Sequence, residues 1–447
     1  MTRKRLVLFI FAVAAAWNLS SVAGLKEYVA KPDDSYAYEF HSQTQVGEDT
    51  IEMVRMTSQT WQNIPWQHWM AMIVPKEVKH PETAMLLVMG YANTDQPPSV
   101  MNSDEARGVQ MVADLTGTVI GVLMQVPNQP LFDGLSEDGL ISYTYEQYYK
   151  DGDDEWPLLL PMAKSAVRAM DTMQAVAKER HQQDIVRFVV AGASKRGWTT
   201  WLTAVADPRV AAICPMVIDV LNMGPQMEHQ KKTYGAYSQM INDYTERGIQ
   251  MLMGTPRGQE LLHVVDPYSY RDQLTMPKLV LLGTNDEYWC VDSANLYFPD
   301  LPGEKHLRYE PNAGHGLGFG IVPAIVSFYN SVLTGENVPP YGWKHTEDGA
   351  LEVTWDCAGA RAVLWQAQSA NRDFRQATWI QTPLDGDGRA VARVSAPASG
   401  WTAYYVEIVF PGIAGGLPYG LCTQMTVTPD TFPEHEAPAA SASVATE

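Results

Sequence analysis

The sequence predicts an α/β fold with a doubly wound, mostly parallel sheet, followed by a smaller β domain. Between about residues 50 and 335, short apolar runs alternate with stretches of helical periodicity, which is typical of a parallel sheet covered by helices on both faces. Ser194, Asp286 and His315 each follow an apolar run. Since functional groups in such sheets gather beyond the carboxyl ends of the strands, these three residues are expected at one edge of the sheet.

The apolar runs have the length of buried strands, and the periodic stretches have the length of helices. The predicted strands cover residues 66–74, 85–89, 118–124, 185–191, 210–217, 278–283 and 306–309. The predicted helices cover residues 104–115, 157–178, 198–206 and 317–333. Residues 221–270 interrupt the alternation with helices rich in Met, Gln and Tyr. This insertion is expected to form a cap over the site, where its Met and Tyr side chains either contact substrate or only pack.

Beyond Pro339 and Pro340 the pattern changes to short strands separated by turn residues. Several short strands at that spacing predict a β-sandwich over residues 341–430. This domain could bind a polymer or partner, or simply cover a sheet edge. Residues 431–447 are mostly Pro, Ala, Ser and Glu and are predicted to be disordered.

The N-terminus has the pattern of an export signal. Residues 3–5 are basic, residues 6–16 are apolar, and residues 21–23 are small, with cleavage predicted after Ala23. The apolar run is too short to span a bilayer comfortably, and no other run is as long. We therefore expect a secreted or periplasmic protein without a stable membrane anchor, whose α/β domain covers residues 24–340.

The chain is strongly acidic. Removing residues 1–23, which carry three positive charges and no negative ones, takes the formal net charge from -19 to -22. Such a chain is repelled by nucleic acid and by anionic membranes, and it attracts cationic peptides or amines. Acidity can also serve only to keep an exported protein soluble. The expected partner is a small-molecule or peptide substrate, and the sequence leaves the oligomeric state open.

Ser194 follows a predicted strand in a Gly192-x-Ser194 turn and precedes a predicted helix. A serine at such a turn is held in a strained conformation that exposes its Oγ, which predicts a nucleophile. The usual pattern places a second glycine two residues after the serine. Here Arg196 takes that place, and Gly197 comes one residue later.

Asp286 and His315 are the predicted partners of this serine. Asp286 follows a buried strand, and His315 lies in a loop of small residues further on, which gives the chain order Ser, Asp, His. In this arrangement the carboxylate orients the imidazole, and the imidazole removes the serine proton. Asp292 is the rival acid, although a helix N-cap also explains it, and Glu287 is expected to point away from Asp286.

The predicted oxyanion donors are the N–H of Lys195 and an N–H of the loop at Gly90 and Tyr91, whose ring would line the pocket. Lys195 and Arg196 are cations in the first turn of a helix, where they oppose the helix dipole. Either a carboxylate such as Asp219 compensates them, or they face an anionic or polarised substrate.

Two acidic segments are further candidates for substrate contact. They are residues 137–138 and residues 151–155, and neither has the spacing of a calcium loop. A solvated loop is the simpler interpretation of the second.

Four cysteines show no short paired spacing, which excludes a typical zinc site. An oxidising compartment permits disulfides, and the positions favour the pairs Cys214–Cys290 and Cys357–Cys422. Cys214 lies in an apolar run and could equally be a buried free thiol. The sequence predicts no metal site and no cofactor.

Several long motifs resemble the PhoPQ-activated pathogenicity-related proteins. They are GASKRGW at 192–198, ICPMVID at 213–219, PNAGH at 311–315, QVPNQPL at 125–131, SED at 136–138 and PMAK at 161–164. The resemblance extends from Leu25 to the end of the C-terminal region. It implies an α/β-hydrolase fold and an exported protein, but it says little about the substrate.

Two functions from different classes remain. The first is an exported serine hydrolase that cleaves an ester or amide through an acyl-enzyme on Ser194. The second is a non-catalytic acidic binding protein that sequesters cationic peptides. The set of Ser194, Asp286 and His315 favours the first, because a pure binding protein does not need it.

Overall fold

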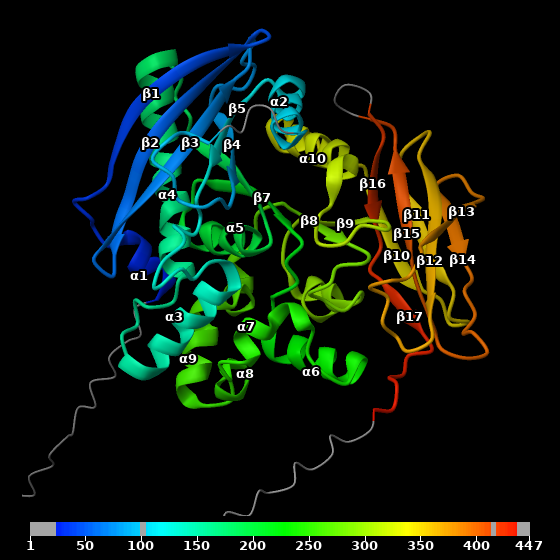
Figure 1. Cartoon of the computed structure of the whole chain (residues 1–447). Coiled ribbons are helices and arrows are strands. Elements are labelled where there is room, and N and C mark those ends of the chain that lie inside the picture. The colour runs from blue at the N-terminus through cyan, green and yellow to red at the C-terminus, as the bar shows by residue number, and fades with distance from the viewer. Residues whose placement is uncertain (1–23, 99–103, 413–416, 436–447) are drawn as a thin grey trace, which may run out of the picture.

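One long mixed β-sheet crosses the protein, with helices on both of its faces (Figure 1). The computed structural model describes residues 24–98, 104–412 and 417–435. The predicted export signal and residues 436–447 of the predicted tail lie outside the described residues. In the described part of the chain, no helix is long and apolar enough to cross a membrane.

The first half of the sheet is an antiparallel meander that leads into a parallel core, in the order β1-β2-β3-β5-β4-β6-β7-β8-β9. The antiparallel strands are β1 (Ala37–Val46), β2 (Asp49–Trp61) and β3 (Ile64–Val74). The parallel strands are β4 (Thr83–Val88), β5 (Val119–Leu123), β6 (Arg187–Ala193), β7 (Val210–Met216), β8 (Lys278–Gly283) and β9 (Lys305–Glu310). This topology is that of the α/β-hydrolase fold, as the sequence predicts.

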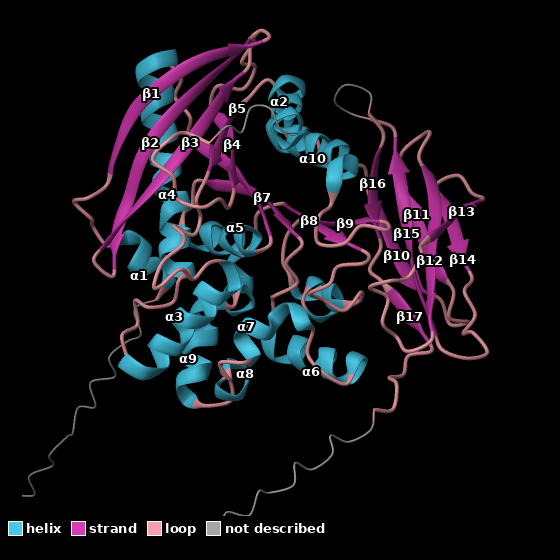
Figure 2. Ribbon diagram, viewed as in Figure 1, coloured by secondary structure: helices cyan, strands magenta, loops and turns pink. Residues whose placement is uncertain are grey.

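The helices are divided between the two faces of the sheet (Figure 2). They are α1 (Leu25–Ala30), α2 (Asp104–Thr116), α3 (Glu137–Asp151), α4 (Leu159–His181), α5 (Lys195–Ala206) and α10 (Val322–Thr334). Because successive side chains of a strand point to opposite faces, Leu86 and Val88 pack in the core with α4 and α5, whereas Met85 packs in the core with α2 and α10.

The segment between β7 and β8 is the helical insertion that lies over the end of the sheet in Figure 1. Its elements are α6 (Met223–Tyr234), η2 (Gln239–Ile241), α7 (Asn242–Thr245), α8 (Ile249–Leu252), α9 (Pro256–Val265) and η3 (Pro267–Gln273). Short 3-10 turns follow later in the chain, namely η4 (Ser293–Leu296), η5 (Phe298–Asp300) and η6 (Gly318–Ile321).

The C-terminal strands form two sheets. One contains β10 (Tyr341–His345), β11 (Leu351–Trp355) and β14 (Arg389–Ala392). The other contains β12 (Arg361–Ser369), β13 (Ile380–Leu384), β15 (Trp401–Phe410), β16 (Tyr419–Cys422) and β17 (Thr426–Thr428). Strand β16 pairs antiparallel with β9 at Cys422 and Leu307, so this second sheet continues the central sheet. The pairing fits the expectation that this domain covers a sheet edge, although the sequence does not specify which strands meet.

The sequence analysis missed β1 and β2. Strand β1 is largely exposed and carries no regular apolar alternation. Strand β2 has a carboxylate, Glu52, at a fully buried position, where Arg180 Nε donates to it at 2.7 Å. Because a charged residue stands at a buried position, the hydrophobic pattern of a buried strand is interrupted, and the strand is not predicted.

The first residues of the predicted tail contact the cap. Phe432 packs edge-on against His229 of α6, with 5.6 Å between the ring centroids. His435 Nε2 lies 3.0 Å from the carbonyl oxygen of Lys232. The described chain after Thr431 therefore follows the surface of α6.

Candidate active site

Ser194 occupies the turn between β6 and α5. Its backbone has φ 57° and ψ -128°, a combination that is costly for a residue with a Cβ and that persists only where the surroundings impose it. Its N–H donates to the carbonyl oxygen of Met216 on the neighbouring strand β7, at 2.9 Å. This strained turn at a strand-to-helix junction is the geometry that exposes a nucleophilic serine in α/β-hydrolases.

Two glycines make this turn possible. A Cβ on Gly192 would lie 2.5 Å from the Arg196 carbonyl oxygen, and a Cβ on Gly197 would lie 2.6 Å from Ile218 Cγ2. Both distances are far too short for a real Cβ contact. The close approach that requires a glycine therefore falls at position 197, which leaves position 196 free to carry the arginine.

His315 lies beyond β9 with its ring held by Asp286. Nδ1 lies 2.9 Å from Asp286 Oδ2 and 3.1 Å from Oδ1. The backbone N–H of His315 donates to Glu287 Oε2 at 2.9 Å, and the ring of Tyr288 lies against the imidazole with 4.3 Å between centroids. Glu287 thus holds the backbone of the histidine, and Asp286 and Tyr288 orient its ring. The sequence analysis missed these roles of Glu287 and Tyr288. The only feature of the sequence that could have indicated them is that both residues directly follow Asp286.

The other ring nitrogen of His315 is poised for a new contact. Nε2 is buried and has no hydrogen-bond partner among the described residues. Ser194 and His315 line the same cavity, although no hydrogen bond joins them in this structure. Hydrogen bonds of catalytic groups often tighten only when substrate is bound. The imidazole nitrogen that has no partner thus belongs to a residue that lines the same cavity as the serine.

Asp292 lies in a different network. Its carboxylate oxygens lie 2.7 Å from His229 Nε2 and 2.9 Å from Arg372 Nη2. Burial alone would raise the pKa of this carboxyl, but the contacts with His229 and Arg372 lower it below its usual range. The carboxylate beside the His315 ring is therefore that of Asp286.

Lys195 and Arg196 are neutralised by the first turn of α3. Lys195 Nζ lies 2.8 Å from Asp138 Oδ2. Arg196 binds Glu137 with both ends of its guanidinium, at 2.6 and 2.8 Å. Burial alone would raise the pKa of the Glu137 carboxyl, but the hydrogen bonds and the charge of Arg196 lower it to about 2. Acidic side chains are favourable at the N-terminus of α3 because of the helix dipole. Here they also neutralise the two cations at the N-terminus of α5.

Asp219 is not the compensating carboxylate, so that expectation was wrong. Its Oδ1 accepts a hydrogen bond of 2.6 Å from the hydroxyl of Tyr297. Burial raises the pKa of Asp219 to about 7. The residue follows the strand beside Ser194, but its side chain is turned toward Tyr297.

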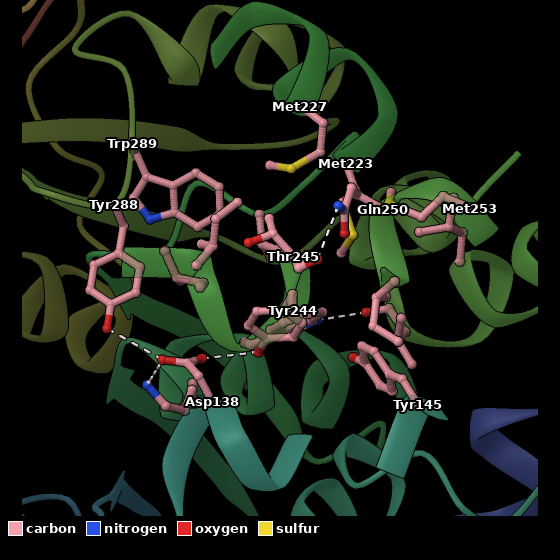
Figure 3. Close-up of a pocket in the computed structure, with 18 of the residues that line it drawn as sticks. Asp138, Tyr145, Met223, Met227, Tyr244, Thr245, Gln250, Met253, Tyr288 and Trp289 are labelled. Atoms are coloured by element: carbon pink, nitrogen blue, oxygen red, sulfur yellow. Dashed lines mark hydrogen bonds and ion pairs between the residues drawn. The ribbon is translucent and has the colours of Figure 1, made fainter. Parts of the chain in front are cut away.

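A cavity lies between the cap and Ser194 (Figure 3). Its walls are mainly apolar and aromatic, with Met223, Met227, Trp198, Trp289, Leu261 and Val265 among the lining residues. A polar cluster stands beside the serine, where Asp138 accepts hydrogen bonds from Lys195 and from the Tyr244 hydroxyl at 2.9 Å. The cap thus supplies both an apolar wall and part of a polar cluster.

The chain matches the family described as PhoPQ-activated pathogenicity-related protein over residues 25–375. It belongs to this family. It is also 32% identical to the autocrine proliferation repressor protein A of Dictyostelium discoideum, over 97% of this chain and 95% of that protein.

Solved structures with a similar fold include acetyl xylan esterases. That of Paenibacillus sp. R4 has a TM-score of 0.49 and 14% identity, over 68% of this chain and 91% of the other. That of Thermoanaerobacterium sp. has a TM-score of 0.46 and 16% identity, over 70% of this chain and 94% of the other.

In this family member, Gly90 lies directly under the Arg196 side chain. A Cβ at position 90 would lie 2.2 Å from Arg196 Nη2, and Arg196 Nε donates to the carbonyl oxygen of Val126 at 2.5 Å. Arg196 therefore fixes the loop after β4 against the serine turn. Tyr91 follows with φ 130° and is 37% exposed. Among the described residues, Gly90 lines a cavity at Ser194, whereas Tyr91 lines neither of the two cavities that contain the serine.

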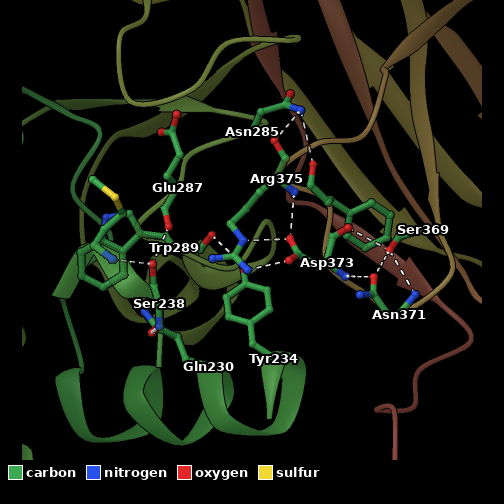
Figure 4. A network of polar contacts seen from close by, with 12 residues as sticks. Gln230, Tyr234, Ser238, Asn285, Glu287, Trp289, Ser369, Asn371, Asp373 and Arg375 are labelled. Carbon is green, nitrogen blue, oxygen red and sulfur yellow. Dashed lines mark hydrogen bonds and ion pairs between the residues drawn. The ribbon is translucent and has the colours of Figure 1, made fainter. Parts of the chain in front are cut away.

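The loops that carry Asp286 and His315 are fastened to the C-terminal region (Figure 4). Asn285 Nδ2 donates to the carbonyl oxygen of Ala377 at 2.7 Å. Asn312 and Trp379 exchange two hydrogen bonds, of 2.8 and 3.1 Å. The segment that connects β12 to β13 therefore braces both loops from outside the hydrolase-like part of the chain.

All four cysteines are free, so neither disulfide considered from the sequence is present. Cys214 is buried within β7, where burial raises the pKa of its thiol. Cys422 lies on β16, where its sulfur accepts the backbone N–H of Tyr309 at 3.4 Å. Cys290 is also buried, whereas Cys357 is only half-buried.

Proposed function

We propose that the protein is an exported serine hydrolase that cleaves an ester or an amide through Ser194, His315 and Asp286. The observation that carries this proposal is the His315 ring. Asp286 holds Nδ1, and the buried Nε2 is left without a partner in the cavity that contains the strained Ser194. A purely structural histidine rarely leaves a buried ring nitrogen unpaired.

In the proposed reaction, His315 Nε2 removes the proton of Ser194 Oγ while a new bond forms between Oγ and the substrate carbonyl carbon. Asp286 keeps the proton of the imidazole on Nδ1 and stabilises the imidazolium that results. His315 then gives the proton to the departing alcohol or amine as its bond to the carbonyl carbon breaks. Water, activated in the same way, hydrolyses the acyl-enzyme to a carboxylic acid and restores Ser194.

Two backbone donors are proposed to stabilise the oxyanion. The N–H of Lys195 lies at the start of α5, where the first amides of a helix lack partners inside the helix. The loop at Gly90 and Tyr91 supplies the second donor, and Arg196 holds this loop in place. A single donor of this kind contributes about 3 kcal/mol to the stabilisation of the transition state.

A fluorophosphonate probe tests the nucleophile. We expect it to label the protein, because a serine paired with a base attacks the phosphorus, and we expect Ser194→Ala to abolish the label. Ser293→Ala is a matched control, since Ser293 is a buried serine at the start of η4 and lies outside the cavity. Undiminished labelling of the Ser194 variant would place the nucleophile elsewhere. Failure of the unmodified protein to react would favour an acidic binding protein.

Export is proposed from the basic, apolar and small-residue segments that end at Ala23. Gly24, the residue that would follow the cleavage, is the N-cap of helix α1, and Leu25 of that helix is buried. N-terminal sequencing of protein recovered outside the cytoplasm should therefore start at or within a few residues of Gly24. Recovery of only the full-length chain in the cytoplasm would contradict the proposal.

A further inference from the structure

A second cavity reaches Ser194 from the other side of the site. It is lined by the sheet and by helices α2 and α10 rather than by the cap. Ser194 and His315 belong to both cavities, so the two spaces meet at the reacting groups. Its walls include Met85, Leu87, Val109, Val112, Ile120 and Ile325.

The second cavity is apolar almost throughout. Among the described residues that line it, the ionisable side chains are His315 and Arg196. The Arg196 guanidinium is already bound by Glu137, so it offers little to a polar ligand. Apolar cavities hold no well-ordered water, and an apolar group gains free energy by entering one.

The cap cavity has a different chemistry where it meets Ser194. Asp138, Lys195 and Tyr244 form a hydrogen-bonded polar cluster there. Both cavities are mainly apolar, and they differ at Ser194. The cap cavity has this cluster beside the serine, whereas the second cavity has the Gly90 loop and an Arg196 side chain that Glu137 already binds. The loop at Gly90, which is the proposed oxyanion side, lines the second cavity and not the cap cavity.

We propose that the second cavity binds the acyl chain of the substrate, so that the protein prefers esters of aliphatic acids of about six to eight carbons over acetate esters. This inference rests on the proposed serine hydrolase function. In the bound ester, the alkyl chain lies between the sheet and helices α2 and α10. The carbonyl oxygen faces the Gly90 loop, and the alcohol lies beside the polar cluster under the cap.

The experiment measures kcat/KM for 4-nitrophenyl acetate, butyrate, hexanoate and octanoate with the mature protein. We expect the value for hexanoate to exceed that for acetate by at least about tenfold, since each methylene that enters an apolar pocket strengthens transition-state binding. Val109→Trp, at a half-buried position on α2, should fill the cavity and move the optimum to acetate or butyrate. Met111→Trp is the matched control, because Met111 lies on the same helix, is 41% exposed and does not line the cavity.

Each outcome decides the question. A profile that does not change with chain length, or one that Val109→Trp leaves as it is while Ser194 still reacts with the fluorophosphonate, would overturn the acyl site and leave the hydrolase standing. A shift caused by Met227→Trp in the cap, but not by Val109→Trp, would place the acyl chain under the cap and would also overturn it. If Val109→Trp does not fold, Val322→Phe on α10 blocks the same cavity. Absence of both labelling and hydrolysis would refute the proposed function and this inference with it.

Discussion

Asp286→Asn is expected to lower kcat by about 10³–10⁴-fold and to leave the fold intact, because an amide in place of the carboxylate no longer holds the imidazole in its working tautomer. His315 Nδ1 lies 2.9 Å from the Asp286 carboxylate, and asparagine has nearly the same shape. The imidazolium formed during attack by Ser194 also loses its counter-charge. Steady-state kinetics on the ester that the protein cleaves best, together with thermal unfolding, measure the two effects separately.

Asp292→Asn is the matched control. It should lower stability and leave kcat almost unchanged, which is the reverse of the result expected for Asp286→Asn. Asp292 binds Arg372, which is 3% exposed, so a neutral residue at 292 leaves a buried cation without its counter-charge. We expect stability to fall by about 1–3 kcal/mol and kcat to change little. If Asp292→Asn abolished turnover while Asp286→Asn did not, the acid would be Asp292 and the geometry at His315 would have been misread.

The sequence alone could identify the candidate site residues that are marked by the pattern of the residues next to them in the chain. Ser194 was found because an apolar run, a glycine turn and a helix are adjacent in the chain. Asp286 and His315 were found because each follows its own strand, and parallel strands bring their carboxyl ends to one edge. The fold gathers the three residues that these separate local signals pointed to, and their joint catalytic role stays a prediction.

What the sequence could not give are contacts between elements that are distant in the chain. Glu137 and Asp138 were considered only for substrate contact, although they neutralise Arg196 and Lys195 across the site. Asp219 was considered as their partner, yet its side chain binds Tyr297 instead. No periodicity specifies which of several acids reaches a given cation, since that depends on side-chain direction and on helix placement.

The C-terminal region shows the same limit. Its strands were expected as a β-sandwich that either binds a polymer or partner or covers a sheet edge. Strand β16 does pair with β9, but the chain pattern does not specify which strand makes that contact. The hydrogen bonds of Asn285 and Asn312 to the segment before β13 are equally invisible in the sequence. These contacts tie the C-terminal strands to the loops of Asp286 and His315. The candidate site is therefore held by residues on both sides of the domain boundary predicted at residue 340.

Glu137→Ala is expected to lower the free energy of unfolding by about 2–4 kcal/mol, because it leaves the cation of Arg196 buried without its carboxylate. Arg196 is 9% exposed, whereas the Glu137 side chain is 41% exposed. Loss of the acid should therefore cost more than Arg196→Ala, which leaves a carboxylate that water can reach. Since Arg196 also lies against Gly90, both variants should reduce kcat through the oxyanion loop, and Glu137→Gln should recover part of the loss.

The control for this ion pair is Asp184→Ala, which breaks a pair with Lys178 in which the side chains are 71% and 60% exposed. Exposed pairs of this kind contribute about 0.2–1 kcal/mol, so the control should change stability far less than Glu137→Ala. Urea unfolding of the single variants and of the Glu137→Ala, Arg196→Ala double variant gives the coupling energy, expected at about 1–3 kcal/mol for residues in one network. A coupling near zero, with stability unchanged in Glu137→Ala, would mean that Lys195 and Arg196 do not depend on α3. The cations beside the nucleophile would then be left for the substrate to neutralise.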